Sequence, residues 1–106
     1  MDDIAWDSID RLQAWLGAGS TLPLEIRRLL QLMKISEETG EVAEAVIGVT
    51  GQNPRKGVSH SWEDVQSEVC DVIIASMVAL TLLTPDARGV FAERLRRVEE
   101  RSAAHR

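Results

Sequence analysis

The sequence has 106 residues, of which 44% are hydrophobic, and its 17 acidic and 12 basic side chains give a formal net charge of −5. This length and apolar fraction predict one folded domain over residues 1–106 and exclude general disorder. Because nucleic acids and anionic membranes attract a surplus of Lys and Arg, the acidic balance argues against both as partners.

The pattern of apolar residues predicts an all-α fold class. Apolar residues recur at three- and four-residue spacing, and no stretch alternates apolar and polar β-branched residues as a strand would. Proline, glycine and capping residues punctuate the pattern, with Thr84 and Pro85 read as the start of the last helix. The expected helices run from Asp3 to about Leu16, from Leu24 to about Val49, from the Ser61 cap to Leu83, and from Phe91 to about Ala103.

The third expected helix is apolar on nearly all sides. Its apolar core, Val69 to Leu83, is shorter than the roughly 20 residues of a membrane span, so we expect a core helix. Three other helices can hardly enclose it in so small a chain, which predicts a homodimer or larger oligomer. The alternative is that the chain's own helices and loop cover it.

The single Cys70 lies within this run, where a buried thiol behaves as a small hydrophobe. With one cysteine and an acidic start, Met1-Asp2-Asp3, instead of a secretion signal, the expected compartment is the reducing cytoplasm.

Carboxylates cluster on the two central helices. On the second, Glu37, Glu41 and Glu44 fall on the side of Ile26, Leu30 and Met33, with Glu38 at its flank, and this side is expected to face the core. On the third, Glu68 and Asp71 interrupt apolar sequence and should also point inward. Acid-rich helix faces are commonly solvated, but an acid pair inside an apolar run is costly unless a cation compensates it.

The ligands on offer are all oxygens, which favours Mg²⁺, with Mn²⁺ as a substitute, over Zn²⁺. Such an ion accepts phosphate oxygens and activates water, as metal-assisted hydrolysis of a phosphoanhydride requires.

The two acidic segments, Glu37-Glu38-Thr39-Gly40-Glu41 and Glu68-Val69-Cys70-Asp71, match the paired motifs EExxE and ExxD. In this the chain resembles the MazG-like all-α nucleoside triphosphate pyrophosphohydrolases, over roughly residues 24 to 83. The resemblance implies a four-helix bundle-like fold assembled as a dimer or tetramer. It also implies Mg²⁺-dependent hydrolysis of a ribo- or deoxyribonucleoside triphosphate to the monophosphate and pyrophosphate.

Carried over residue by residue, the resemblance assigns metal binding to Glu38, Glu41, Glu68 and Asp71. Glu37, with Glu38, would assist the attacking water or hold a further metal. Glu44 lies outside the motif.

Phosphate and base contacts are predicted from the residues outside the motifs. Arg55 and Lys56, in the one long loop, either bind phosphate or form a solvated pair. Asn53 either contacts a base or makes a turn. Each tryptophan is expected to pack in the core; if one of them contacts the base, Trp15 is favoured, with Trp62 close behind.

Two other functions stay open at this stage. One is a phosphoribosyl-ATP pyrophosphohydrolase, although the segment after Asp71 departs from that branch of the resembled family. The other is a helical dimer that binds metal and nucleotide without hydrolysis.

Overall fold

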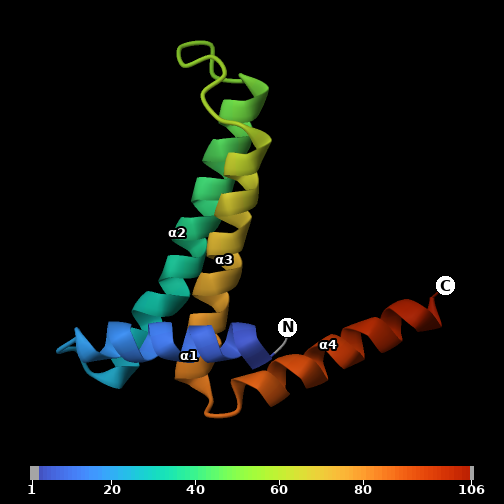
Figure 1. The fold of residues 1–106 in the computed structure, drawn as a ribbon. Helices are drawn as coiled ribbons and strands as arrows, with labels where there is room; N and C mark the ends of the chain where they lie inside the picture. Colours follow the sequence, from blue (N-terminus) through green and yellow to red (C-terminus); the bar gives the residue numbers. More distant parts are fainter. Residues whose placement is uncertain (1–2, 106) are drawn as a thin grey trace.

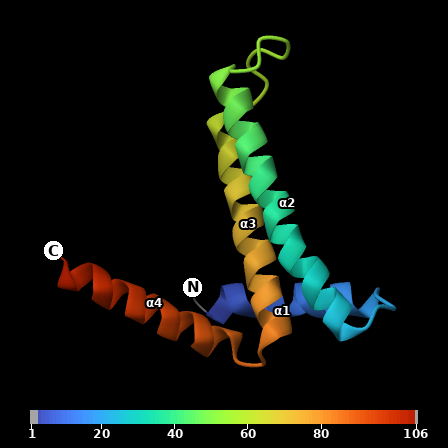
Figure 2. The same ribbon diagram turned by 180° about the vertical axis from the view of Figure 1, so that it is seen from behind.

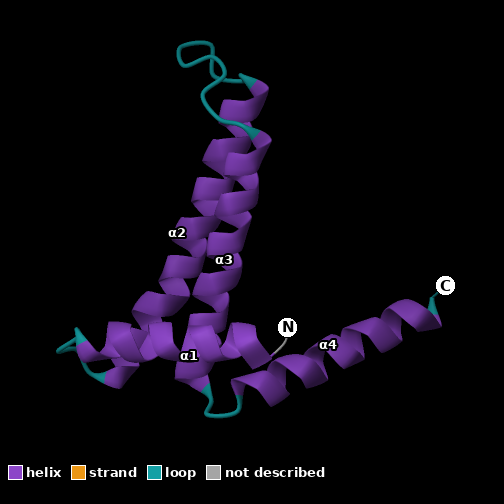
Figure 3. Ribbon diagram, viewed as in Figure 1, coloured by secondary structure: helices purple, strands orange, loops and turns teal. Residues whose placement is uncertain are grey.

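The computed structural model describes residues 3–105, which form four α-helices joined by loops, with no strand in this range (Figure 3). The predicted all-α class is therefore confirmed. The helices are α1 (Asp3–Ala18), α2 (Leu24–Thr50), α3 (Trp62–Leu83) and α4 (Ala87–Ala104).

Helices α2 and α3 form a long antiparallel hairpin, and they lie side by side in both views (Figures 1 and 2). The loop that joins them stands at one end of the hairpin. Helix α1 crosses the other end, and α4 leads away from it. The acidic motifs thus lie along the hairpin, on the two helices that pack most extensively against each other.

Local sequence explains where the central helices begin and end. Ser61 closes a capping box at the start of α3: its hydroxyl accepts from the Asp64 N–H at 3.2 Å, and Asp64 accepts from the Ser61 N–H at 2.9 Å. Helix α2 ends at Thr50 and is capped by Gly51, whose φ of 67° lies in the left-handed region that favours glycine.

The start of α4 differs from the prediction. Thr84 caps the end of α3, and the side chain of Asp86 accepts from the Gly89 N–H as the true N-cap, so α4 begins at Ala87. Both Thr and Asp are good capping residues, and proximity to Pro85 does not distinguish them.

A small hydrophobic core sits where α1, α3 and α4 meet. Trp6 is 3% exposed and packs edge-to-face on Phe91, with ring centroids 6.1 Å apart. Ile9, Met77, Val78 and Ala87 complete the cluster. This core fixes α1 across the base of the hairpin, where α1 forms one wall of the site described below.

The side of α2 that was expected to face the core is exposed in the structure, so that expectation is wrong. The exposed residues on this side are Ile26, Leu30, Met33, Glu37, Glu41 and Glu44. The face turned to α3 carries Gln31, Ile35, Glu38, Val42 and Ala45, all half-buried or buried. Helix α2 therefore has two apolar stripes, one covered by α3 and one open.

Two more expectations about burial are wrong. Cys70 is exposed instead of being buried as a small hydrophobe, and Trp15 is 71% exposed. The expectation that the apolar run of α3 is too short for a membrane span differs from the structure as well: α3 is, by length and composition alone, long and apolar enough to cross a membrane, and 28% of its most apolar window is buried.

Candidate metal centre

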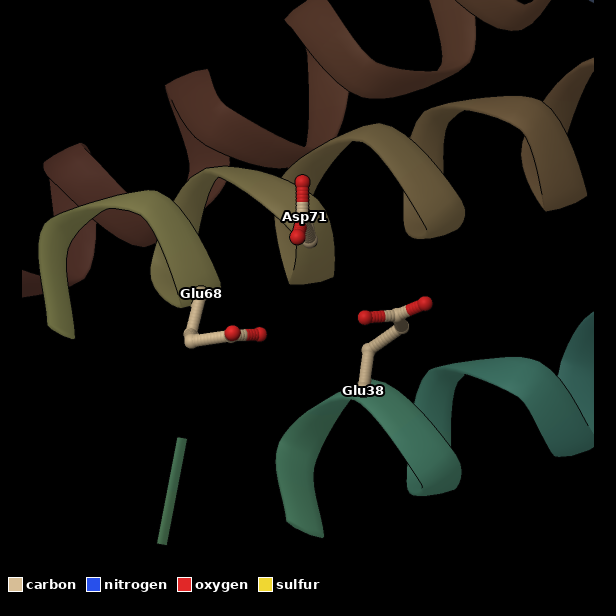
Figure 4. A group of neighbouring side chains, drawn as sticks. All are labelled: Glu38, Glu68 and Asp71. Carbon is tan, nitrogen blue, oxygen red and sulfur yellow. The ribbon is translucent and has the colours of Figure 1, made fainter. Parts of the chain in front are cut away.

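Three carboxylates from two helices meet between α2 and α3. Glu38 from α2 and Glu68 from α3 extend toward each other, and Asp71 lies beside them on α3 (Figure 4). Each residue offers a carboxylate oxygen that lies within 4.8 Å of those of the other two. Glu38 and Glu68 are half-buried and Asp71 is exposed, so the group is open to solvent on one side.

Helix geometry explains this meeting. Residues three apart in a helix share a side, so Glu68 and Asp71 point the same way from α3. Glu38 lies seven residues from both Gln31 and Ala45, and seven residues are close to two helical turns, so it shares their inward face. The carboxylates are thus held by two packed helices instead of by a mobile loop.

The group repels itself in the absence of a cation. Burial, together with the negative charges of Asp71, Glu41 and Glu38, raises the pKa of Glu68 above its usual 4.5, and His60 partly offsets this. Lys34, one turn before Glu38 on α2, forms an ion pair with it at 3.2 Å, as its i, i+4 spacing predicts.

The donor set fits a hard divalent cation. All three groups present oxygen, the ligand type that Mg²⁺ and Mn²⁺ prefer. Two oxygens that share one Mg²⁺ lie about 3 Å apart in adjacent positions and about 4.2 Å apart in opposite positions, so the three side chains would close by up to about 2 Å to share one ion. Three carboxylates also leave coordination positions for water or phosphate oxygens.

The other predicted acids lie around this group. Glu41 is outside the three but close enough for its charge to raise the pKa of Glu68. Glu37 precedes Glu38 in the chain and lies about 100° from it around the helix, on the exposed side. Glu44 is also exposed, and it lines a different pocket at the loop.

The predicted substrate-binding residues of the loop lie near the pocket that Glu44 lines, and not at the carboxylates. Asn53 makes a turn: its side-chain oxygen accepts from the Arg55 N–H at 3.0 Å, and its carbonyl accepts from the Lys56 and Gly57 N–H groups. Asn53 and Lys56 line a loop pocket of about 340 Å³ against the end of α2, whereas Arg55 is exposed and is not part of its lining. The carboxylates lie further along the hairpin, since Glu38 is twelve residues, about 18 Å of helix, before the end of α2.

The last part of the loop packs closely against α2 at Gly48. At Gly48 a Cβ atom would stand 2.0 Å from the Nδ1 atom of His60, so only glycine allows His60 to lie against the helix. His60 is half-buried and lines the loop pocket, while its charge reaches Glu68.

A pocket of about 330 Å³ adjoins the carboxylates between α1, α2 and α3, and we call it the three-helix pocket. Its lining is Leu12 and Leu16 from α1, Gln31, Lys34 and Glu38 from α2, and Asp71, Ile74, Ala75 and Val78 from α3. It has apolar walls with a few polar groups at the edge, which is typical of small-molecule sites.

The three-helix pocket contains residues that the sequence analysis missed and lacks one that it favoured. Leu12, Leu16 and Gln31 had been overlooked as site residues, whereas Trp15, the favoured base contact, is exposed and does not line it. Trp62 is exposed at the start of α3 and does not line it either. A signal for Gln31 existed: it is a polar residue seven positions before Glu38, on the same face of α2.

Comparisons with protein-family models, with curated proteins and with solved structures found no match to this chain.

Proposed function

We propose that this chain is a Mg²⁺-dependent nucleoside triphosphate pyrophosphohydrolase. The observation that carries the proposal is the three-carboxylate group of Glu38, Glu68 and Asp71, held between two packed helices and continuous with an apolar pocket of nucleoside-sized volume. The paired acidic motifs and their MazG-like resemblance support the same reaction.

Each part of the site has a role in this proposal. Glu38, Glu68 and Asp71 would hold the cation, with Glu41 as a fourth carboxylate beside them. A bound Mg²⁺ supplies charge neutralisation for the phosphates and activation of water. Glu37 or Glu38 is the candidate base that would take a proton from the attacking water.

Positive charge at the phosphate end comes from this chain's own residues. Lys34 stands at the edge of the three-helix pocket and already pairs with Glu38. With Glu38 serving as a metal ligand, the ammonium group of Lys34 would be free to pair with a phosphate oxygen. Arg55 and Lys56 would reach the phosphate chain only from the loop end of the hairpin.

A second copy of the chain belongs to the proposal. The Cα radius of gyration is 16.9 Å, against about 13 Å for a compact domain of this length. The accessible surface is 7655 Å², against about 5,900 Å² for a folded monomer of this mass. The excess of about 1,800 Å² per chain corresponds to about 3,600 Å² for two chains, which falls within the range of total area buried in obligate dimer interfaces. A four-helix bundle-like arrangement would then be completed between chains, as a dimer or tetramer.

The test is release of nucleoside monophosphate and pyrophosphate from ribo- and deoxyribonucleoside triphosphates of each base, with Mg²⁺, with Mn²⁺ and with chelator. Chelator-sensitive release of both products in equal amounts would support the proposal and rank the bases. Silence across the panel, from folded protein that binds Mg²⁺, would refute it. The alternatives would then be hydrolysis of phosphoribosyl-ATP, which would be assayed next, and binding of metal and nucleotide without hydrolysis.

A further inference from the structure

The side-chain amide of Gln31 forms part of the wall of the three-helix pocket. It lies on α2, and its Nε2 donates a hydrogen bond of 3.0 Å to the main-chain oxygen of Ala75 on α3. Ala75 is one helical turn, about 6 Å, beyond Asp71. The amide therefore sits one turn from the carboxylates, on the pocket's side away from the loop.

The bond to Ala75 fixes which way the amide points. A main-chain carbonyl only accepts hydrogen bonds, so the amino group of Gln31, and not its amide oxygen, makes this bond. No group among residues 3–105 donates a hydrogen bond to the amide oxygen. Since no buried side-chain oxygen in this range lacks a partner, this oxygen is accessible. One acceptor, Oε1, and one remaining N–H of Nε2 are thus oriented and open to a ligand.

The walls around this amide suit a flat, apolar ring. Leu12 and Leu16 from α1 and Ile74 and Val78 from α3 surround it, while the charged groups lie toward the carboxylates. An amide presents a donor beside an acceptor, and it pairs in two-bond fashion with nucleobase edges that carry the complementary pair, as Gln does with adenine.

We propose that Gln31 is a specificity-determining residue that binds the nucleobase of the substrate, an inference that rests on the proposed function. Oε1 accepts from an N–H of the base, and the free N–H of Nε2 donates to the neighbouring acceptor of the base. The base lies between the apolar walls, and the phosphate chain extends one turn along the hairpin to the carboxylates.

Binding, not turnover, tests this inference. Isothermal titration with Mg²⁺ measures the affinity of wild type and Gln31→Met for α,β-methylene nucleoside triphosphates of each base, which are not cleaved, and for inorganic triphosphate, which has no base. We expect Gln31→Met to weaken the tightest nucleotide by about 3- to 10-fold and to leave inorganic triphosphate within about twofold. Gln66→Met, on the exposed side of α3, is the matched control and should change neither.

The remaining outcomes separate the two proposals. Equal weakening of nucleotide and inorganic triphosphate in Gln31→Met, or no weakening of either, would overturn base recognition by Gln31. So would a wild type that binds inorganic triphosphate as tightly as any nucleotide. If loss of the bond to Ala75 unfolds Gln31→Met, then Gln31→Asn, which withdraws the amide by one methylene, should show the same nucleotide-selective loss. A wild type that binds the analogues selectively but never hydrolyses the natural nucleotides would refute the proposed function alone.

Discussion

Replacing Met33 by glutamate tests whether a second copy of the chain covers the outward face of α2. Met33 is 68% exposed and lies on the open apolar stripe with Ile26, Leu29 and Leu30. In a symmetric dimer that buries this stripe, each substitution occurs twice, and it places a carboxylate where a flexible apolar side chain packs.

The size of the effect follows from the exposed surface. Burying a whole methionine side chain contributes about 1.5–3 kcal/mol, and about two thirds of Met33 is still available for burial. The two substitutions in one dimer therefore reduce the favourable free energy of association by about 2–4 kcal/mol, before the cost of desolvating the carboxylates is added. Since 1.4 kcal/mol is a factor of ten, the dimer Kd should rise by at least about 30-fold.

Analytical ultracentrifugation over a concentration series measures this Kd directly. A matched control is Val58→Glu, which adds the same charge at an exposed apolar residue in the loop instead of on the stripe. The wild-type Tm should also rise with protein concentration, because association stabilises the folded chain. A stable wild-type monomer with a Tm independent of concentration would refute the reasoning.

Other predictions concern the carboxylates and the start of α3. Glu41→Gln should lower metal-dependent turnover by at least about 10-fold with unchanged helical circular dichroism, whereas Glu44→Gln should not; equal activity in both would contradict a role for Glu41 at the metal. Because the pKa of Glu68 is raised, stability without metal should fall as pH rises from 4.5 through that pKa. Glu68→Gln should then raise the metal-free Tm at pH 7 and abolish stabilisation by Mg²⁺, and a lowered metal-free Tm would count against the repulsion. Ser61→Ala should lower the free energy of unfolding by about 1 kcal/mol in denaturant titrations, and an unchanged midpoint would exclude the cap as a stabilising element. Hydrogen bonds from Ser61 lower the pKa of Asp64, so the advantage of wild type over Asp64→Asn should be present above pH 3.8 and vanish as pH falls through the lowered pKa; a pH-independent difference would contradict this.

The placement of the acid pair on one side of α3 was predictable from the sequence. Glu68 and Asp71 interrupt an apolar run at i, i+3 spacing, so helix periodicity alone placed them on one side, and the structure brings both to Glu38. The helix bounds were also predictable, because capping residues, proline and glycine mark them locally; the start of α4 is the exception.

The rotation of α2 could not be predicted from periodicity. The helix has an inner apolar stripe through Ile35 and Val42 and an outer one through Leu30 and Met33, and both have helical spacing. Which stripe meets α3 depends on tertiary packing, so Glu38, expected at the flank, is the acid that faces α3. The three-helix pocket was missed because it depends on where α1 crosses the hairpin, which no local pattern encodes.

The central claim is that carboxylates shared by α2 and α3 hold the cation that supports triphosphate hydrolysis. Its most direct test measures nucleoside monophosphate and pyrophosphate together, from wild type and Asp71→Asn, with Mg²⁺ and after chelation. We predict equal amounts of both products from wild type, suppressed by chelator and lost in Asp71→Asn while its helical content is kept. Chelator-insensitive release, or full activity in Asp71→Asn, would contradict the claim.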